Sequence, residues 1–357
     1  MKRDSRVFPI GGLILLLGLM LSILPVRAAN AETIATTIDG LYRAAKEEGK
    51  VVFYSPRDVP YVQKMYAKFR ERFPGIEVEH LDIRQGEIVE RIITEDRVGK
   101  CTIDVGFGGE ATIKPLTDRG LIATYQWRKA FDIPESFVQI GGRGIVQATQ
   151  MYVYAYNTNL VKNPEKFPRP VKELLESFLA PELKGKIIVE RRGWPFARLA
   201  TVYAGDEWMT NYLKRLKAHD PVICKGIGVT GNLLAAGAGY ICLPLYLYQY
   251  NLLKSQGAPL GWFKMNPMSY ALRLLYVTEK APHPNAARLW AGWFCSSEGT
   301  KMWEEISTQG IVLPGSGTKA RELIERENIT LLTEKNSEEL AQSRKNMEKY
   351  RDILMGK

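Results

Sequence analysis

The stretch KVVFYSP, residues 50–56, predicts a buried strand that ends in a turn. An alternation of strands and helices starts there. Apolar runs predict further strands at 76–80 and 103–107, and apolar residues at helical spacing predict helices over 38–48, 60–73, 86–98 and 112–118. This alternation is typical of a parallel sheet covered by helices. The loops that follow its strands, at 54–58 and 107–112, are therefore the expected functional loops.

A second alternation follows a long extended run at 146–157. Its expected elements are strands at 186–190, 221–224 and 240–243 and helices at 194–204, 206–218, 230–238 and 246–256. The chain returns through an apolar extended stretch at 272–278 and ends in helices expected at 284–306 and 337–355. The chain has 357 residues, which is long enough for about two domains.

The two alternations predict an α/β protein of two lobes. The first lobe is expected to comprise residues 32–150 and a return segment of about 268–316, and the second to comprise 151–267. Residues 317–357 form a C-terminal helical segment that the sequence assigns to neither lobe.

The first 31 residues have the pattern of a secretory signal peptide. A basic start is followed by an apolar run at 7–26 and by Ala29-Asn30-Ala31, which fits a cleavage site after Ala31. An uncleaved N-terminal anchor is the alternative, although prolines and glycines interrupt the run. No cysteine follows the run, so a lipid-anchored protein is not expected. We therefore expect export to the periplasm.

The composition is that of an ordinary globular protein, with 45% hydrophobic and 25% charged residues. The formal net charge is +10, but basic residues are mixed with acidic ones along the chain. No basic run with interleaved aromatic residues occurs, so nucleic acid is not an expected partner. The mild positive charge favours anionic solutes weakly.

Four cysteines could form two disulfides in an oxidising compartment. We predict Cys224–Cys242, because the strands that carry them are joined by one helix and should be parallel neighbours. A Cys101–Cys295 pair within the first lobe is the second expectation. Buried free thiols are the alternative, since a chain of this length needs no covalent staples.

No catalytic or metal-binding constellation stands out. The three histidines have no metal-ligand spacing, and no Gly-x-Ser-x-Gly elbow is present. Residues 106–111 (GFGGEA) match a dinucleotide fingerprint, but they follow the third strand rather than the first, so we interpret them as a tight loop facing a cleft. No cofactor and no metal are expected.

The candidate ligand-binding residues come from loops that follow strands. Arginines there can bind carboxylate or phosphate, and free amides at the start of a helix can bind an anion. Surface arginines, an N-cap role for Thr230 and packing of the tyrosines are the alternative interpretations. The candidates are Tyr54, Ser55, Arg57, Gly108 and Gly109 in the first lobe, and Arg191, Arg192, Trp194, Thr230, Asn232, Tyr246 and Tyr248 in the second.

Several motifs resemble the type II periplasmic solute-binding proteins of ABC transporters, the group that includes ferric-ion binders. They are 49–55 (GKVVFYS), 73–76 (FPGI), 103–105 (IDV), 156–158 (YNT), 183–187 (LKGKI), 281–287 (APHPNAA) and 296–299 (SSEG). The resemblance implies two lobes joined by a hinge, a small-molecule ligand in the cleft between them and delivery to a permease of the inner membrane. A monomer is expected.

The chain departs from the iron-binding members of that group. They carry two adjacent tyrosines where this chain has Tyr246-Leu247-Tyr248. Asp58, Glu110 and Tyr248 could still offer the hard oxygen ligands that ferric iron prefers, so an iron binder is kept as an alternative. The altered set favours a small anionic solute.

Two further functions are open alternatives at this point. The chain could be a ligand sensor that docks on a membrane receptor, which the sequence does not distinguish from a transport protein. It could also be a secreted enzyme on the same scaffold, which the lack of a catalytic constellation disfavours.

Overall fold

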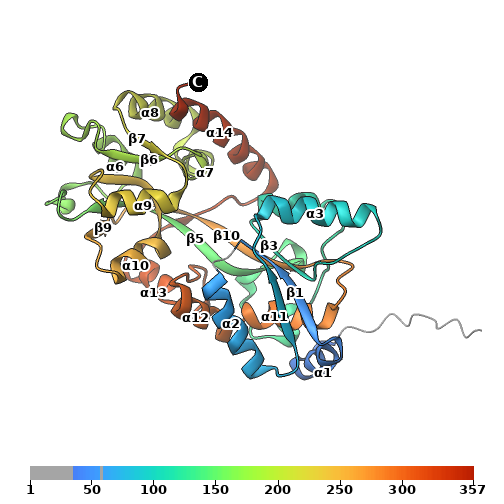
Figure 1. Cartoon of the computed structure of the whole chain (residues 1–357). Coiled ribbons are helices and arrows are strands. Elements are labelled where there is room, and N and C mark those ends of the chain that lie inside the picture. The colour runs from blue at the N-terminus through green and yellow to red at the C-terminus, as the bar shows by residue number, and fades with distance from the viewer. Residues whose placement is uncertain (1–34, 57–58) are drawn as a thin grey trace, which may run out of the picture. The chain divides into compact units, whose positions relative to one another are not determined.

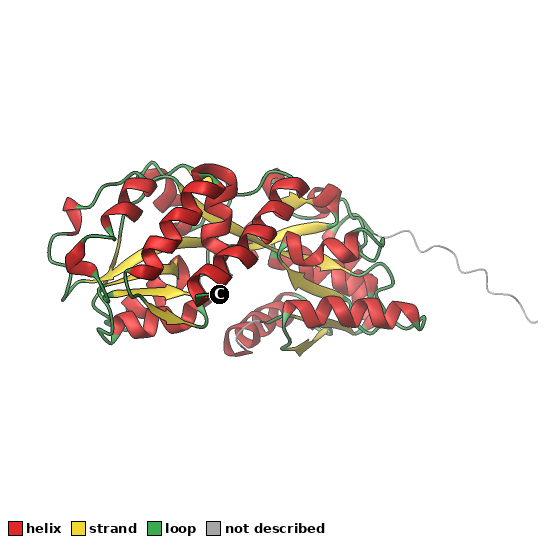
Figure 2. Ribbon diagram, turned by 90° about the horizontal axis from the view of Figure 1, so that it is seen from above, coloured by secondary structure: helices red, strands yellow, loops and turns green. Residues whose placement is uncertain are grey.

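The computed structural model describes residues 35–56 and 59–357, which form one compact unit. The expected signal peptide, Arg57 and Asp58 lie outside the described residues. In Figure 2, strands run through the middle of this unit and helices cover them on both sides. No described helix is long and apolar enough to cross a membrane.

The first strand–helix alternation occurs as expected (Figure 1). Its strands are β1 (Lys50–Tyr54), β2 (Glu77–Leu81) and β3 (Val105–Gly108), and its helices are α1 (Ile38–Glu48), α2 (Val59–Arg72), α3 (Gln85–Arg97) and α4 (Glu110–Thr117). β1 pairs in parallel with β2 and β3. The short helix α5 (Trp127–Ala130) and the strand β4 (Val138–Gln139) lead into β5 (Gly144–Asn157).

The second alternation follows β5. Its strands are β6 (Ile187–Glu190), β7 (Val222–Cys224), β8 (Ile241–Tyr246) and β9 (Leu260–Trp262), and its helices are α6 (Val171–Ser177), α7 (Trp194–Leu199), α8 (Asp206–Ala218), α9 (Ile227–Ala235) and α10 (Leu247–Ser255). The chain returns along β10 (Met268–Val277) and ends in α11 (Pro284–Phe294), α12 (Ser297–Ser307), α13 (Lys319–Arg326), β11 (Leu331–Leu332) and α14 (Ser337–Met355).

Within the described ranges, eleven strands form one sheet in the order β2-β1-β3-β10-β5-β8-β6-β7, with β4 and β9 pairing with β5 and β11 with β10. A parallel set therefore lies on each side of the antiparallel pair β5–β10. β5 has 14 residues and pairs with β10 through its first part and with β8 and β9 through its last. One strand thus belongs to both halves of the sheet.

A buried carboxylate ties the first half together. Asp104 has no exposed surface, and it accepts hydrogen bonds from the backbone N–H of Val52 at 2.7 Å and from that of His283 at 2.7 Å. The His283 ring Nδ1 lies 2.8 Å from the same carboxylate. Asp104 therefore connects β1 to the start of α11, which explains this residue of the 103–105 motif.

The helix expected at 284–306 is two helices, because Ser296 caps the second one. Its hydroxyl accepts a hydrogen bond from the Gly299 N–H at 3.2 Å, which starts α12 after α11 has ended. A polar residue that can cap a helix explains this break inside an apparently continuous pattern.

The predicted disulfides are wrong, because all four cysteines are free. β6 lies between β7 and β8: Cys224 stands opposite Glu190 and Cys242 opposite Ile188, both on β6. Two strand spacings separate the cysteine Cα atoms by about 10 Å, beyond the roughly 4.4–6.8 Å of a disulfide. Burial raises the pKa of the Cys224 thiol to about 11 and that of Cys242 to about 12. Both thiols are therefore neutral and unreactive at physiological pH.

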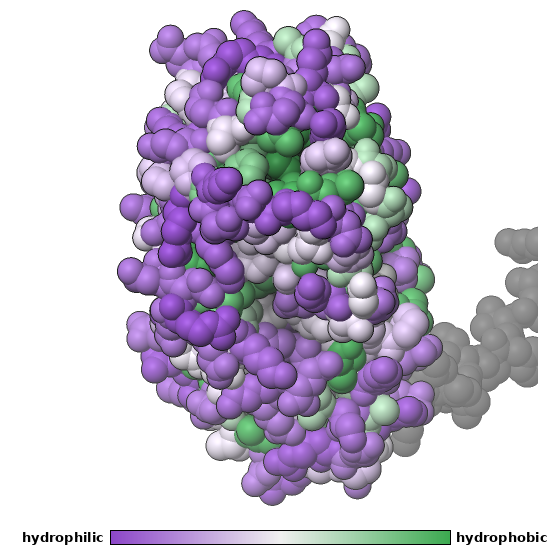
Figure 3. Space-filling view, turned by 90° about the vertical axis from the view of Figure 1, so that its left-hand side faces the viewer, coloured by the Kyte–Doolittle hydropathy of each residue, from purple (hydrophilic) through white to green (hydrophobic). Residues whose placement is uncertain are grey.

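Figure 3 shows a face on which hydrophilic atoms predominate and hydrophobic ones occupy small areas.

Candidate functional site

The candidate site is a cavity of about 380 Å³ that is lined from both halves of the sheet. From the first half come Gln85 of α3 and the start of α4; from the second come the end of β6, α7 and the end of β8. β10 contributes Ala271–Arg273, and the C-terminal segment contributes residues from Thr333 to Met347. The cavity therefore lies where strands end and helices begin, which is the expected place for a ligand in an α/β sheet.

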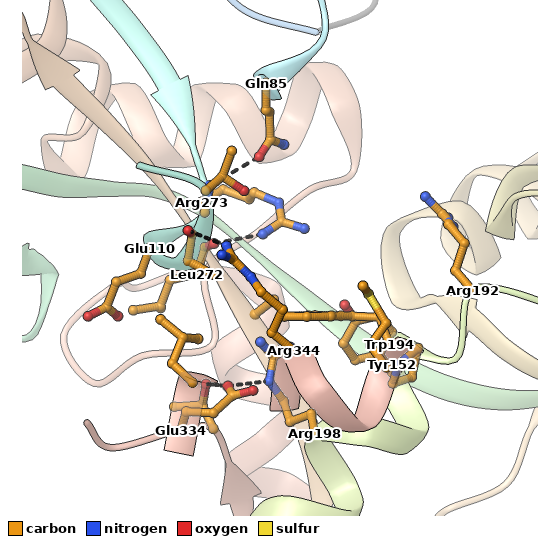
Figure 4. Close-up of a pocket in the computed structure, with 18 of the residues that line it drawn as sticks. Gln85, Glu110, Tyr152, Arg192, Trp194, Arg198, Leu272, Arg273, Glu334 and Arg344 are labelled. Carbon is orange, nitrogen blue, oxygen red and sulfur yellow. Dashed lines mark hydrogen bonds and ion pairs between the residues drawn. The ribbon is translucent and has the colours of Figure 1, made fainter. Parts of the chain in front are cut away.

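Three guanidinium groups gather in this cavity. They belong to Arg198 of α7, Arg273 of β10 and Arg344 of α14 (Figure 4). Arg192 also lines the cavity, but Figure 4 shows it apart from the other three. Guanidinium groups bind carboxylate and phosphate groups through paired hydrogen bonds, so this part of the cavity suits an anionic group.

Arg198 forms an ion pair with Glu334, but one of its nitrogens has no hydrogen-bond partner among the described residues. Its side chain is 5% exposed, and its Nε donates a hydrogen bond to Glu334 Oε2 at 2.5 Å. Its Nη1 is buried without a hydrogen-bond partner in the described part of the chain. The guanidinium lies beside the ring of Trp194, with 5.6 Å from Cζ to the ring centroid, which holds it against the cavity wall.

Arg273 depends on a glycine for its position. Its Nη1 donates to the Leu272 carbonyl at 2.9 Å and its Nη2 donates to Gln150 Oε1, while its Nε has no partner among the residues described. A Cβ atom on Gly109 would lie 2.8 Å from Nη1. Gly109 thus gives the guanidinium room to lie against the start of α4.

The glycines of the 106–111 segment serve packing. A Cβ on Gly106 would lie 2.3 Å from the buried ring of Tyr276, and one on Gly108 would lie 2.6 Å from the Ile113 side chain. These close approaches account for the glycines without a dinucleotide. The interpretation of the segment as a tight loop is only partly right. Residues 106–108 belong to β3 and α4 starts at Glu110, so Gly109 alone separates them; it lines the cavity, but its N–H donates to Gln85 Oε1 at 3.1 Å.

Three carboxylates also line the cavity, and they differ in their partners. Glu190 is 1% exposed and accepts hydrogen bonds from Arg192 Nε at 2.8 Å and from the Gly226 N–H at 3.2 Å. Burial of the Arg192 side chain lowers its pKa, but the charge of Glu190 raises it, and the pKa of Arg192 lies above its usual value. Arg192 is thereby committed largely to Glu190.

Glu110 is the first residue of α4, and its side chain has no hydrogen bond or ion pair with any described residue. It is half-buried in the cavity wall. Burial, and then the charge of Glu334, raise the pKa of its carboxyl. No described basic side chain therefore neutralises the carboxylate of Glu110.

Four of the twelve candidate residues line this cavity: Gly109, Arg192, Trp194 and Tyr246. Seven do not: Tyr54, Ser55, Gly108, Arg191, Thr230, Asn232 and Tyr248. Ser55, for example, is fully buried, and its hydroxyl lies 3.0 Å from the Nε2 of His80. Tyr248 lines a separate hollow of about 130 Å³ with Gln150 and Ser307. The twelfth, Arg57, lies outside the described residues.

Thr230 and Asn232 lie within α9 and not at its start, which corrects the expected helix of 230–238. The helix begins at Ile227, after Gly226. Thr230 is fully buried, and its hydroxyl is within hydrogen-bond distance of the carbonyl oxygens of Ile227, at 2.5 Å, and Pro244, at 3.1 Å. Its backbone N–H donates to the Gly226 carbonyl at 3.4 Å and is not available to an anion, and the N-cap of the helix is Gly226 rather than Thr230.

Sequence reasoning missed Arg198, Arg273 and Arg344, although two of them left a signal. Arg273 is the only charged residue in the apolar strand MSYALRLLYV, residues 268–277. Arg198 follows Trp194 by four residues, so the two share one face of a helix. Arg344 lies among many charged residues of α14, and its place is set by tertiary packing alone.

Comparison with solved structures shows a common fold. The substrate-binding protein of an ABC transporter from Agrobacterium tumefaciens has 20% identity and a TM-score of 0.68 and covers 87% of this chain and 96% of its own. Iron-bound HitA from Pseudomonas aeruginosa has 16% identity and a TM-score of 0.68, covering 85% of this chain and 99% of its own. This is the type II periplasmic binding protein fold.

A third such structure, AfuA from Actinobacillus pleuropneumoniae with fructose-6-phosphate bound, has 18% identity and a TM-score of 0.65 and covers 86% of this chain and 99% of its own. No protein-family model matches the chain, and no curated protein matches it in sequence. The named neighbours are binding proteins, and at these identities the likeness establishes the fold.

The oxygen ligands considered for iron are not brought together. Glu110 lines the main cavity, Tyr248 lines the smaller hollow, and Asp58 lies outside the described residues. Among described residues, no group of three or more His, Cys, Asp or Glu side chains is placed to hold a metal ion.

Proposed function

We propose that this chain is the substrate-binding component of an ABC importer and that it captures a small anionic solute in the 380 Å³ cavity. The observation that carries the proposal is that the guanidiniums of Arg198, Arg273 and Arg344 line one cavity, and among the described residues Arg198 alone of the three has a carboxylate partner. Arg273 and Arg344 thus bring positive charge that no described carboxylate offsets, and guanidinium groups bind carboxylate and phosphate groups well.

This proposal assigns the anion to different arginines from those favoured by the sequence. Arg191 does not line the cavity, and Arg192 is paired with Glu190. Arg198, Arg273 and Arg344 are therefore the residues proposed to bind the anionic group, with Trp194 and Tyr246 as apolar walls and Gly109 as the spacer.

The transport role rests on the fold and the N-terminal segment. Bound solutes of this fold group are enclosed between two lobes, and we assign residues 35–150 with about 268–316 to one lobe and 151–267 to the other. α14 packs on α7 and α8, and this packing supports including the C-terminal helix in the second lobe. We further propose that residues 1–31 are removed on export to the periplasm, where the protein acts as a monomer and delivers its solute to a permease.

The test begins with the solute. Mass spectrometry of material released from the purified protein should identify a small anion, and calorimetry should then compare its binding to Arg273→Met and to the parent. Loss of one buried charged hydrogen bond should cost about 2–5 kcal/mol, which is a loss of tens- to thousands-fold in affinity.

Arg191→Met is the matched control, because Arg191 follows the same strand as Arg192 but lies outside the cavity lining. It should bind the solute as the parent does. A neutral sugar or a metal ion as the released solute, or full affinity in Arg273→Met, would show that the proposal is wrong.

A further inference from the structure

We propose that the solute also carries a protonated amine, which binds at Glu110, so that the ligand is a small zwitterion or amino-anion. This inference rests on the proposed function and deepens it. Its basis is the distribution of charge in the cavity, which contains an unneutralised carboxylate as well as the three guanidiniums.

The charged groups that line the cavity are four arginines and three glutamates. Arg192 pairs with Glu190 at 2.8 Å and Arg198 with Glu334 at 2.5 Å. Among the described residues, Arg273 and Arg344 then remain as cations without a carboxylate, and Glu110 remains as a carboxylate without a basic partner. A ligand whose charges complement these three groups needs both an anionic end and a cationic end.

A simple anion would increase the electrostatic repulsion near Glu110 and Glu334. It would bring more negative charge into a space that Glu110 shares with Glu334, whose charge already disfavours ionisation of Glu110. An ammonium group at Glu110 supplies three hydrogen-bond donors and a positive charge, and the charge offsets that of the nearby carboxylates.

The two ends of such a ligand would lie at different places. In Figure 4 the carboxylate of Glu110 lies apart from the guanidinium groups of Arg273 and Arg344. Glu110 and Arg344 come from α4 and α14, elements of opposite halves, and Arg344 Nη2 already donates to the Ala111 carbonyl at 2.7 Å. A ligand with separated charges could therefore place its anionic end at Arg273 and Arg344 and its cationic end at Glu110.

A hydroxyl group could also donate a hydrogen bond to Glu110, but it would not neutralise its charge. We therefore expect the amine to be distinguished from the hydroxyl by affinity. The distinction can be measured with ligands that differ only in one terminal group.

The experiment uses two matched sets of probes with the full mature protein. One set is ethyl phosphate, 2-hydroxyethyl phosphate and 2-aminoethyl phosphate; the other is butyrate, 4-hydroxybutyrate and 4-aminobutyrate. Calorimetry should give at least about tenfold tighter binding for the amine than for the hydroxyl and alkyl members in one set, and the set that binds identifies the anion as phosphate or carboxylate.

Glu110→Gln should abolish this preference while leaving the affinity for the alkyl member unchanged or higher. Glu90→Gln is the control, since Glu90 is an exposed carboxylate of α3 outside the cavity. The preference should survive in that variant.

The outcomes separate this inference from the proposed function. If alkyl or hydroxyl members bind as tightly as the amines, or if the amine preference persists in Glu110→Gln, the inference is wrong and the anion proposal stands. If no member binds more tightly than about 1 mM, the inference is wrong, and release of a non-anionic solute from the purified protein would overturn the anion proposal separately.

Discussion

At the residue scale, Glu110 connects ligand recognition with stability. Its carboxyl has a pKa above the ordinary value of 4.5, because burial and then the charge of Glu334 disfavour ionisation. The folded protein therefore holds this proton more tightly than the unfolded chain does, and stability falls as the pH rises from about 4.5 through the raised pKa.

Glu110→Gln should remove that penalty. Without ligand, we expect the variant to melt roughly 1–2 °C above the parent at pH 7, with the difference vanishing below about pH 4.5. Thermal unfolding followed by circular dichroism across this range measures the effect, with Glu90→Gln as the exposed control. A variant less stable than the parent at pH 7 would contradict the interpretation.

The pair Arg198–Glu334 is the second residue-scale test. Both side chains are at most 5% exposed, so removing one leaves a buried unpaired charge. Arg198→Met should cost about 3–5 kcal/mol in the free energy of unfolding, measured by urea denaturation. The double variant Arg198→Met/Glu334→Met should recover most of that loss, because the remaining buried atoms of the pair, Arg198 Nη1 and Glu334 Oε1, lack partners within the described residues. A single variant that loses less than about 1 kcal/mol would exclude an important stabilising role for the pair.

The residues of the site were only partly predictable for a physical reason. Loops after strands led to Gly109, Arg192, Trp194 and Tyr246, because the carboxyl ends of strands meet at one edge. Arg344 comes from a helix 150 residues after Trp194, and nothing local in α14 marks it. Arg273 was visible as a lone charge in an apolar strand, a signal that a search confined to loops does not weigh.

At the element scale, local patterns predicted most helices and strands to within a few residues, and the errors arose at boundaries and in pairing. α9 begins three residues before its expected start, because Gly226 rather than Thr230 precedes the first turn. The order β8-β6-β7 was missed, because one helix joins β7 to β8 and that connection does not say which strand lies between them. The disulfide prediction depended on that order and is wrong for that reason.

The C-terminal helix is the element whose role the sequence left most open. The spacing predicted α14 at 337–355, and it occurs at Ser337–Met355. Its packing on α7 and α8 arises from contacts far apart in the chain, such as the Tyr350 hydroxyl donating to Asp206 Oδ1 at 2.8 Å. The same helix carries Arg344 into the cavity, so an element that could be located from its sequence acquires its function only through tertiary contacts.

At the scale of the whole molecule, the shared strand β5 should make the two halves unfold together. β5 pairs with β10 through its first part and with β8 and β9 through its last part, so its loss would open both halves of the sheet. We expect one cooperative transition, with peptides from β1 and β6 losing protection at the same urea concentration in pulsed hydrogen exchange.

A bound solute should move that transition as a unit, because the cavity is lined from both halves. At a free concentration of 100 times the dissociation constant, binding should add about 2.7 kcal/mol to the free energy of unfolding, and β1 and β6 should shift by the same amount. Arg273→Met should unfold in one transition too, but at the same solute concentration its shift should nearly vanish. Separate midpoints for β1 and β6, or a shift confined to one of them, would mean that β5 does not couple the halves and that the solute is held by one lobe alone.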